Sequence, residues 1–187
     1  LDLKKCLNSD WLGLFRLKKD SFPLKFYFLS GNRSLHPNLL ASINQMRINQ
    51  RTRLEPNKID DFEKKIYANN SDNSNKDDDI PFSILIGLPT NQANLSKLMS
   101  SEEVGKVATV QVLIDYLDEK GAAGVIPLPD DRKPIANMNI FTPNSQFIQK
   151  LLKQLMPNLT IHQAKRDDGE ILDDENNFLV LILLKLA

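Results

Sequence analysis

The chain has 187 residues, enough for a single domain, 1–187, whose hydrophobic core we expect to begin at about residue 10. Lysine plus arginine and aspartate plus glutamate each number 24, so the formal net charge is zero and no whole-molecule field attracts nucleic acid or an anionic membrane. The single cysteine, Cys6, excludes an intrachain disulfide, and the two widely separated histidines do not supply the ligand set of a zinc site.

The N-terminal third predicts a hairpin, a short helix and an arginine-rich strand. An apolar run at 10–18 and an aromatic-rich run at 22–30 predict two strands joined by a short polar turn. Proline opens a short helix at 37–44, and His36 is expected in the turn before it. Residues 46–54 are predicted to form one continuous strand.

The rest of the chain alternates helices and strands without a repeated βαβ unit. Apolar residues at three- and four-residue steps predict helices at 56–68, 95–99, 101–120 and 145–156. Apolar runs predict strands at 80–88, 124–129, 135–141 and 178–186. Two polar segments, the acidic 69–79 and the charged 165–177, are predicted to be loops, the first of them flexible. The order favours a mixed α+β domain, a barrel or strongly curved sheet with helices packed outside it.

The predicted strand 46–54 has two very different faces. Side chains alternate across a strand, so Arg47, Arg51 and Arg53 share one face with Asn49, while the opposite face is mostly apolar. Alternate residues of a strand lie about 6.5–7 Å apart, and three guanidinium groups along one edge repel one another. An anion such as a phosphate or a carboxylate would relieve this repulsion, and arginine offers a planar fork of donors for it. The alternative is a solvated edge strand, on which positive charge deters aggregation.

Two further positions add to the case for an anion site. Tyr116 and Lys120 are four residues apart on the predicted helix 101–120, so a hydroxyl donor and an ammonium share one helix face. Lys18 adds a cation at the end of the first strand. Each also has a simpler interpretation, a solvent-facing helix turn for the pair and an ordinary turn lysine for Lys18.

Signatures of enzymes are absent from the sequence. It contains no Gly-x-Gly-x-x-Gly, no Walker phosphate-binding loop and no Gly-x-Ser-x-Gly elbow, and its carboxylates cluster in polar segments. We therefore expect neither catalysis nor a metal or other cofactor. The apolar run at 178–184 is also too short to span a bilayer.

Several short segments, in order, resemble the SPOC domain found at the C-terminus of split-ends (Spen) family proteins. The resemblance covers about 10–187. Its segments are WLGLFRLK at 11–18, FLSGN at 28–32, MRINQRTRLE at 46–55, IGLP at 86–89 and IDYLDEKGAAGVI at 114–126. It implies a distorted seven-stranded β-barrel framed by α-helices.

The resemblance also implies a function. Spen-type SPOC domains are nuclear docking modules of transcriptional regulation and repression that bind acidic, serine-phosphorylated peptides. Such peptides include corepressor tails of the SMRT and NCoR type and the phosphorylated tail of RNA polymerase II. We expect a monomer whose basic patch matches the family's binding residues at Lys18, Arg47, Arg51, Arg53, Tyr116 and Lys120.

RNA binding through the arginine strand is the competing expectation. A row of arginines can follow a phosphate backbone. The row is short, however, the net charge is zero, and no aromatic platform accompanies it. We therefore expect this domain not to bind nucleic acid directly.

Overall fold

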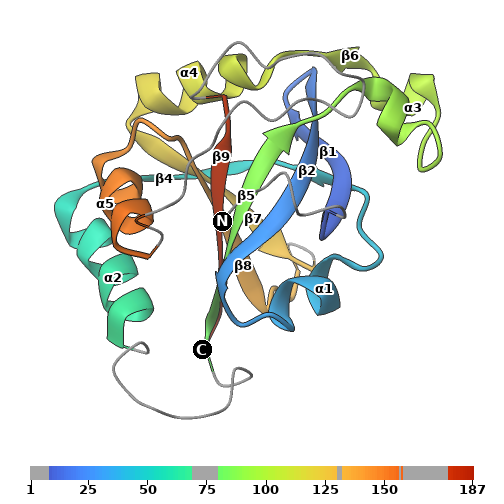
Figure 1. The fold of residues 1–187 in the computed structure, drawn as a ribbon. Coiled ribbons are helices and arrows are strands. Elements are labelled where there is room, and N and C mark those ends of the chain that lie inside the picture. The colour runs from blue at the N-terminus through green and yellow to red at the C-terminus, as the bar shows by residue number, and fades with distance from the viewer. Residues whose placement is uncertain (1–8, 69–79, 130–131, 156, 158–176) are drawn as a thin grey trace.

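The structure, a computed structural model, describes residues 9–68, 80–129, 132–155, 157 and 177–187 (Figure 1). Its strands are β1 (Trp11–Leu17), β2 (Asp20–Gly31), β3 (Gln45–Arg47), β4 (Gln50–Arg53), β5 (Phe82–Pro89), β6 (Lys106–Val107), β7 (Ala122–Leu128), β8 (Ala136–Phe141) and β9 (Leu179–Lys185). Its helices are α1 (Leu35–Leu40), α2 (Pro56–Tyr67), the 3₁₀ turn η4 (Gln92–Leu95), α3 (Ser101–Val104), α4 (Val110–Lys120) and α5 (Gln146–Leu155). The predicted loop 69–79, and all of 165–177 except its last residue, lie outside the described residues.

The strands of the described residues form one curled sheet. Its order is β3-β1-β2-β5-β9-β8-β7-β4, and β6 pairs with β2. The strands β3 and β4 lie at opposite ends of this order, although only Ile48 and Asn49 separate them along the chain. The segment 46–54, called the arginine segment below, therefore connects the two edges of the sheet and curls the sheet into a half-barrel. Counting β3 and β4 as one broken strand and leaving β6 aside gives the seven strands expected of the α+β barrel.

The two larger hydrophobic cores lie on the two faces of the sheet, and a small third cluster gathers Leu14, Leu95, Met99 and Val104. Along β9, residues 179, 181 and 183 belong to one core, whereas 180, 182 and 184 belong to the other. This strand is buried on both faces, which explains its unbroken apolar run. Helices α1 and α4 pack on the first core, and α2 and α5 pack on the second. Figure 1 shows α2 beside α5 and α4 across the other end of the sheet.

The arginine segment is not the continuous strand that its alternation predicts. It breaks at Ile48 and Asn49, because β3 pairs in parallel with β1 whereas β4 pairs antiparallel with β7. The predicted exposure is nevertheless confirmed, since Arg47, Arg51 and Arg53 are all exposed.

The prediction of one helix over 101–120 is also wrong, because the middle of this range is not helical. Gly105 adopts a positive φ of 67° and ends α3, and the next two residues pair with β2 as the strand β6. Helix α4 begins only at Val110. Val107 and Val112, two of the apolar residues on which the helix prediction rested, are 43% and 45% exposed.

Smaller differences concern the short helices. The helix predicted at 37–44 is α1, which begins before Pro37 and includes a buried His36, so that residue is not in a turn. The helix predicted at 95–99 is the preceding 3₁₀ turn η4. The other predicted elements differ from those of the structure by one or two residues at their ends.

Candidate functional site

The candidate site is organised around Tyr116, one turn before the end of α4. Its ring is half-buried and packs against the first core. Lys18 Nζ and Arg51 Cζ each lie 5.4 Å from the ring centroid, and Arg51 Nη1 donates a hydrogen bond of 2.5 Å to Tyr116 Oη. Because Oη accepts from Arg51, the proton of the Tyr116 hydroxyl stays available for an acceptor on a ligand.

Lys18 and Arg47 are held together through the main chain. Lys18 occupies the tight turn between β1 and β2 with a positive φ of 55°. Its carbonyl oxygen accepts a hydrogen bond of 3.3 Å from Arg47 Nη1. This contact uses one donor of Arg47 and leaves the other N–H groups of its exposed guanidinium for a ligand.

Arg53 and Lys120 lie where β4 meets the C-terminal end of α4. Arg53 is opposite Ala122 in the ladder between β4 and β7, and Leu54 N donates to Gly121 O at 3.0 Å. Alternation puts Arg53 on the same strand face as Arg51. Contacts thus join Lys18 to Arg47 and Tyr116, and Tyr116 to Arg51, while Arg53 and Lys120 lie near the junction of β4 and α4.

The charges of this surface are poorly balanced. Among the described residues, no carboxylate lies within 4.0 Å of the cationic groups of Lys18, Arg47, Arg51 or Arg53. Glu119 is the acidic neighbour, and its Oε1 pairs with Lys120 Nζ at 2.7 Å. The hydrogen bond and charge of Lys120, with a smaller contribution from Lys18, lower the pKa of Glu119. We define the basic patch as Lys18, Arg47, Arg51, Arg53, Tyr116 and Lys120.

Sequence reasoning missed two residues beside the basic patch, Glu119 and Arg16. Arg16 is opposite Arg47 in the parallel ladder and therefore points to the same side of the sheet. Its guanidinium donates to Gln45 Oε1 at 3.0 Å and to Ser21 Oγ at 3.3 Å. Alternation with Lys18 along the predicted first strand was the signal that could have identified it.

The chemistry available at the basic patch is anion binding by guanidinium, ammonium and hydroxyl donors. Within the described ranges, no group of three or more His, Cys, Asp or Glu residues could hold a metal ion. No helix in the same part of the chain is long and apolar enough to cross a membrane.

Comparison with known proteins gives the class of this fold and site. The profile of the SPOC domain matches residues 2–185, so the chain belongs to the SPOC domain family. SPOC domains are in general non-catalytic protein-interaction modules in transcription. The family implied by the sequence segments is thereby confirmed.

Particular relatives include the RNA-binding protein spenito of Drosophila melanogaster, which is 30% identical over 88% of this chain. Human Msx2-interacting protein is 30% identical over 80% of the chain, and the protein split ends of Drosophila melanogaster is 28% identical over 80%. The matched regions are 19%, 4% and 2% of these relatives, so the chain spans less than a fifth of their length.

The crystal structure of the SPOC domain of human PHD-finger protein 3 is similar to this fold. The TM-score is 0.51 with 16% sequence identity, and the match covers 96% of this chain and 99% of that one. At this identity the likeness supports the fold alone, the α+β half-barrel with helices outside it.

Proposed function

We propose that this domain docks an extended, acidic, serine-phosphorylated peptide on the basic patch, in the nucleus and in transcriptional regulation, without catalysis. The observation that carries the proposal is the set of cations around Tyr116 that have no carboxylate partner among the described residues. The resemblance to Spen-type domains supports a corepressor tail of the SMRT or NCoR type, or the phosphorylated RNA polymerase II tail, as the source of the peptide.

The residues divide into phosphate-binding and steering roles. Arg51 and Arg53 donate charge-assisted hydrogen bonds to the phosphate, and Tyr116 donates its free hydroxyl proton. Each hydrogen bond to a charged group is worth about 1.5–3 kcal/mol, so losing Arg51 or Arg53 weakens binding about tenfold or more. Lys18, Arg47 and Lys120 attract the flanking acidic residues and raise the association rate.

The test is fluorescence anisotropy at about 150 mM salt. Three labelled probes of equal length are titrated with the domain: the acidic phosphoserine peptide, its unphosphorylated form and a single-stranded RNA. The domain is used as wild type and as the variant Arg51→Ala, Arg53→Ala. The matched control is the variant Lys97→Ala, Lys153→Ala, which also removes two exposed cations. Lys97 follows η4 and Lys153 lies in α5, so neither belongs to the basic patch.

Binding that requires both the phosphate and the two arginines, and that survives in the control variant, is the expected result. Equal affinity for both peptides would contradict phosphate recognition. Preference for RNA, with a steep dependence on salt, would replace the peptide by a nucleic acid as the partner.

A further inference from the structure

At one edge of the sheet, main-chain groups have no partner strand among the described residues. Strand β3 is the last strand at its end of the sheet order. In its parallel ladder with β1, Leu14 N donates to Asn44 O at 3.0 Å and Ile48 N donates to Arg16 O at 2.8 Å. Because parallel ladders use alternate residues, the even-numbered residues of this segment face β1. The N–H and C=O groups of Gln45 and Arg47 therefore point away from β1.

These groups face a groove between β3 and the end of β7. The groove has a volume of about 400 Å³ and is lined by residues 42–47, by Asn49 and by residues 126–129. It arises because the chain leaves β1 after Arg47 and joins β7 only at the pair Gln50 and Val125. The rest of β7, Ile126 to Leu128, therefore has no partner in β4.

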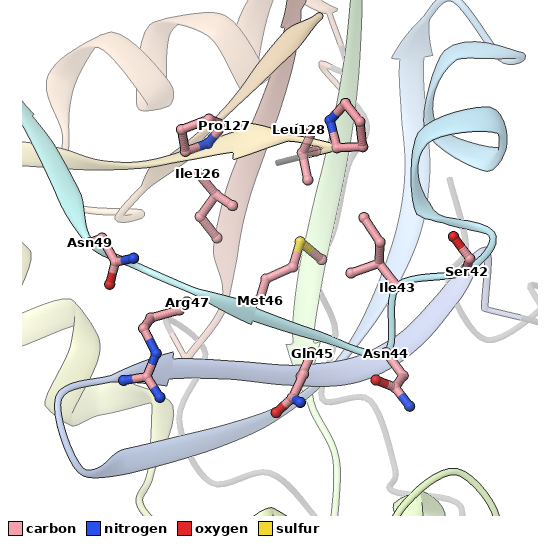
Figure 2. Close-up of a pocket in the computed structure, with 11 residues that line it drawn as sticks. Ser42, Ile43, Asn44, Gln45, Met46, Arg47, Asn49, Ile126, Pro127 and Leu128 are labelled. Atoms are coloured by element: carbon pink, nitrogen blue, oxygen red, sulfur yellow. The ribbon is translucent and has the colours of Figure 1, made fainter. Parts of the chain in front are cut away.

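Figure 2 shows the apolar side chains of the groove. Ile43 and Met46 project from one side toward Ile126 and Leu128 on the other. The β7 side also carries Pro127 and a second proline at position 129, which have no N–H to donate. Of the two sides of the groove, β3 is therefore the one with regularly spaced donors and acceptors.

We propose that the docked peptide passes through this groove as an added β-strand, hydrogen-bonded to the free edge of β3. This inference rests on the proposed function, and the occupant is the same acidic phosphopeptide. Arg47 makes the groove continuous with the basic patch, since its main chain faces the groove while its guanidinium donates to the Lys18 carbonyl. The described residues of the lining include no aspartate or glutamate.

Strand addition also specifies the side chains of the peptide. Residues of an added strand alternate between the two faces of the sheet. One set lies over Ile43 and Met46, which suits small apolar side chains. The other set faces solvent near Arg47, which suits aspartate, glutamate or phosphoserine. We therefore expect acidic and small apolar residues to alternate beside the phosphoserine.

The first experiment is an N-methyl scan of the phosphopeptide against the wild-type domain, read by anisotropy. Methylation removes one N–H at a time. Strand addition predicts losses of about two- to tenfold at every second position beside the phosphoserine, with small effects between them. Uniform small effects, with phosphate dependence intact, would overturn strand addition but not phosphopeptide docking. A parent peptide indifferent to phosphate would instead contradict the proposed function.

The second experiment changes β3 itself. Gln45→Pro removes the N–H that faces the groove, whereas Gln45→Ala keeps it and removes only the side chain that accepts from Arg16 Nε. We expect Gln45→Pro to bind the phosphopeptide about two- to tenfold more weakly than Gln45→Ala, with its dependence on phosphate retained. Equal affinities in the two variants would contradict the proposal. If Gln45→Pro does not fold, the N-methyl scan still decides the question.

Discussion

Tyr116 is the residue on which the geometry of the basic patch depends most. Its ring is anchored in the first core, while its hydroxyl accepts from Arg51 and its faces lie near two cations. An arginine on an exposed strand has many rotamers, and fixing one of them before the ligand arrives lowers the entropy cost of binding. Tyr116 therefore positions Arg51 as well as offering a donor.

Replacing Tyr116 by phenylalanine tests this role. The variant keeps the ring but loses both the acceptor for Arg51 and the donor for the phosphate. We expect phosphopeptide affinity to fall about three- to tenfold, while the free energy of unfolding changes by less than about 1 kcal/mol. Anisotropy and urea denaturation measure the two effects. Tyr67→Phe, which removes a hydroxyl that donates to Gln154 on the α2 and α5 side, is the control and should bind normally.

Under the proposed function, Glu119 is expected to compete with the phosphopeptide for Lys120. Their exposed ion pair holds the Lys120 ammonium at 2.7 Å from a carboxylate oxygen. Glu119→Gln removes the competing charge, so we expect the phosphopeptide to bind about two- to threefold more tightly. Glu63→Gln breaks the corresponding exposed pair with Lys150 at 2.8 Å and should leave affinity unchanged. Weaker binding by Glu119→Gln would mean that Glu119 supports the patch.

His36 is a buried residue whose titration bears on stability. It stacks on Phe28 with ring centroids 5.4 Å apart, and its Nε2 lies 3.5 Å from Asp10 Oδ1. Burial lowers the pKa of His36, the charge and hydrogen bond of Asp10 oppose this shift, and Arg33 adds to it. The folded state therefore favours the neutral imidazole.

The sign of the pH effect follows from this lowered pKa. The stabilising contribution is complete above the unfolded pKa of about 6.5 and is lost as the pH falls through the lower folded pKa. We expect the Tm of the wild type to fall more between about pH 7.5 and pH 5 than the Tm of His36→Phe, which cannot titrate. Equal losses in a thermal denaturation series would contradict the assignment.

At the scale of elements, the position of β3 depends on close packing between β1 and the chain segment that leads into β3. The Trp11 ring covers Gly13, and Trp11 Nε1 donates to Ile43 O at 2.6 Å just before β3. A Cβ atom on Gly13 would lie 2.1 Å from Trp11 Cζ2 and 2.5 Å from the main-chain oxygen of Asn44. A side chain at this position must therefore displace both the ring and the chain leading into β3.

We expect Gly13→Ala to lower the free energy of unfolding by about 1–3 kcal/mol, measured from the midpoint of urea denaturation. Gly87→Ala is the matched control. A Cβ atom there meets only side-chain atoms at 3.5 Å or more, so this β5 substitution should cost less. If both variants were equally stable, the close packing of Trp11 over Gly13 would not be what fixes the entry to β3.

The elements also show where local patterns stop being informative. Alternation at 46–54 predicted correctly that the three arginines are exposed, because exposure depends on side-chain chemistry. It could not predict the break at Ile48 and Asn49, because the break depends on which strands lie beside each half. The helix predicted at 101–120 failed for the same reason, since Lys106 and Val107 pair with the distant β2.

At the scale of the whole molecule, the basic patch combines residues that are far apart in the sequence. Local sequence patterns could identify each residue as a candidate, but they could not predict that the residues lie close together in space. Arg51 and Tyr116 are 65 positions apart, yet they share a hydrogen bond because β4 pairs with β7, the strand that follows α4. The resemblance to the SPOC family supplied this proximity in advance. The resemblance did not indicate Arg16 or Glu119. Alternation with Lys18 could have identified Arg16, whereas the pairing of Glu119 with Lys120 depends on the arrangement of neighbouring side chains.

The zero net charge of the chain has a consequence for binding at this scale. Attraction of the peptide comes from a local excess of cations, so it acts only within about one Debye length, 8 Å at physiological salt. We therefore attribute specificity to direct contacts with the phosphate and not to long-range steering.

The central claim is that Arg51 recognises the phosphate, and a double-mutant cycle tests it most directly. Isothermal titration of wild type and Arg51→Ala with the phosphorylated and unphosphorylated peptides gives the coupling energy between the guanidinium and the phosphate. The account predicts a coupling of about 1.5–3 kcal/mol. A coupling below about 0.5 kcal/mol, with phosphate-dependent binding intact, would contradict it and assign the phosphate to other residues.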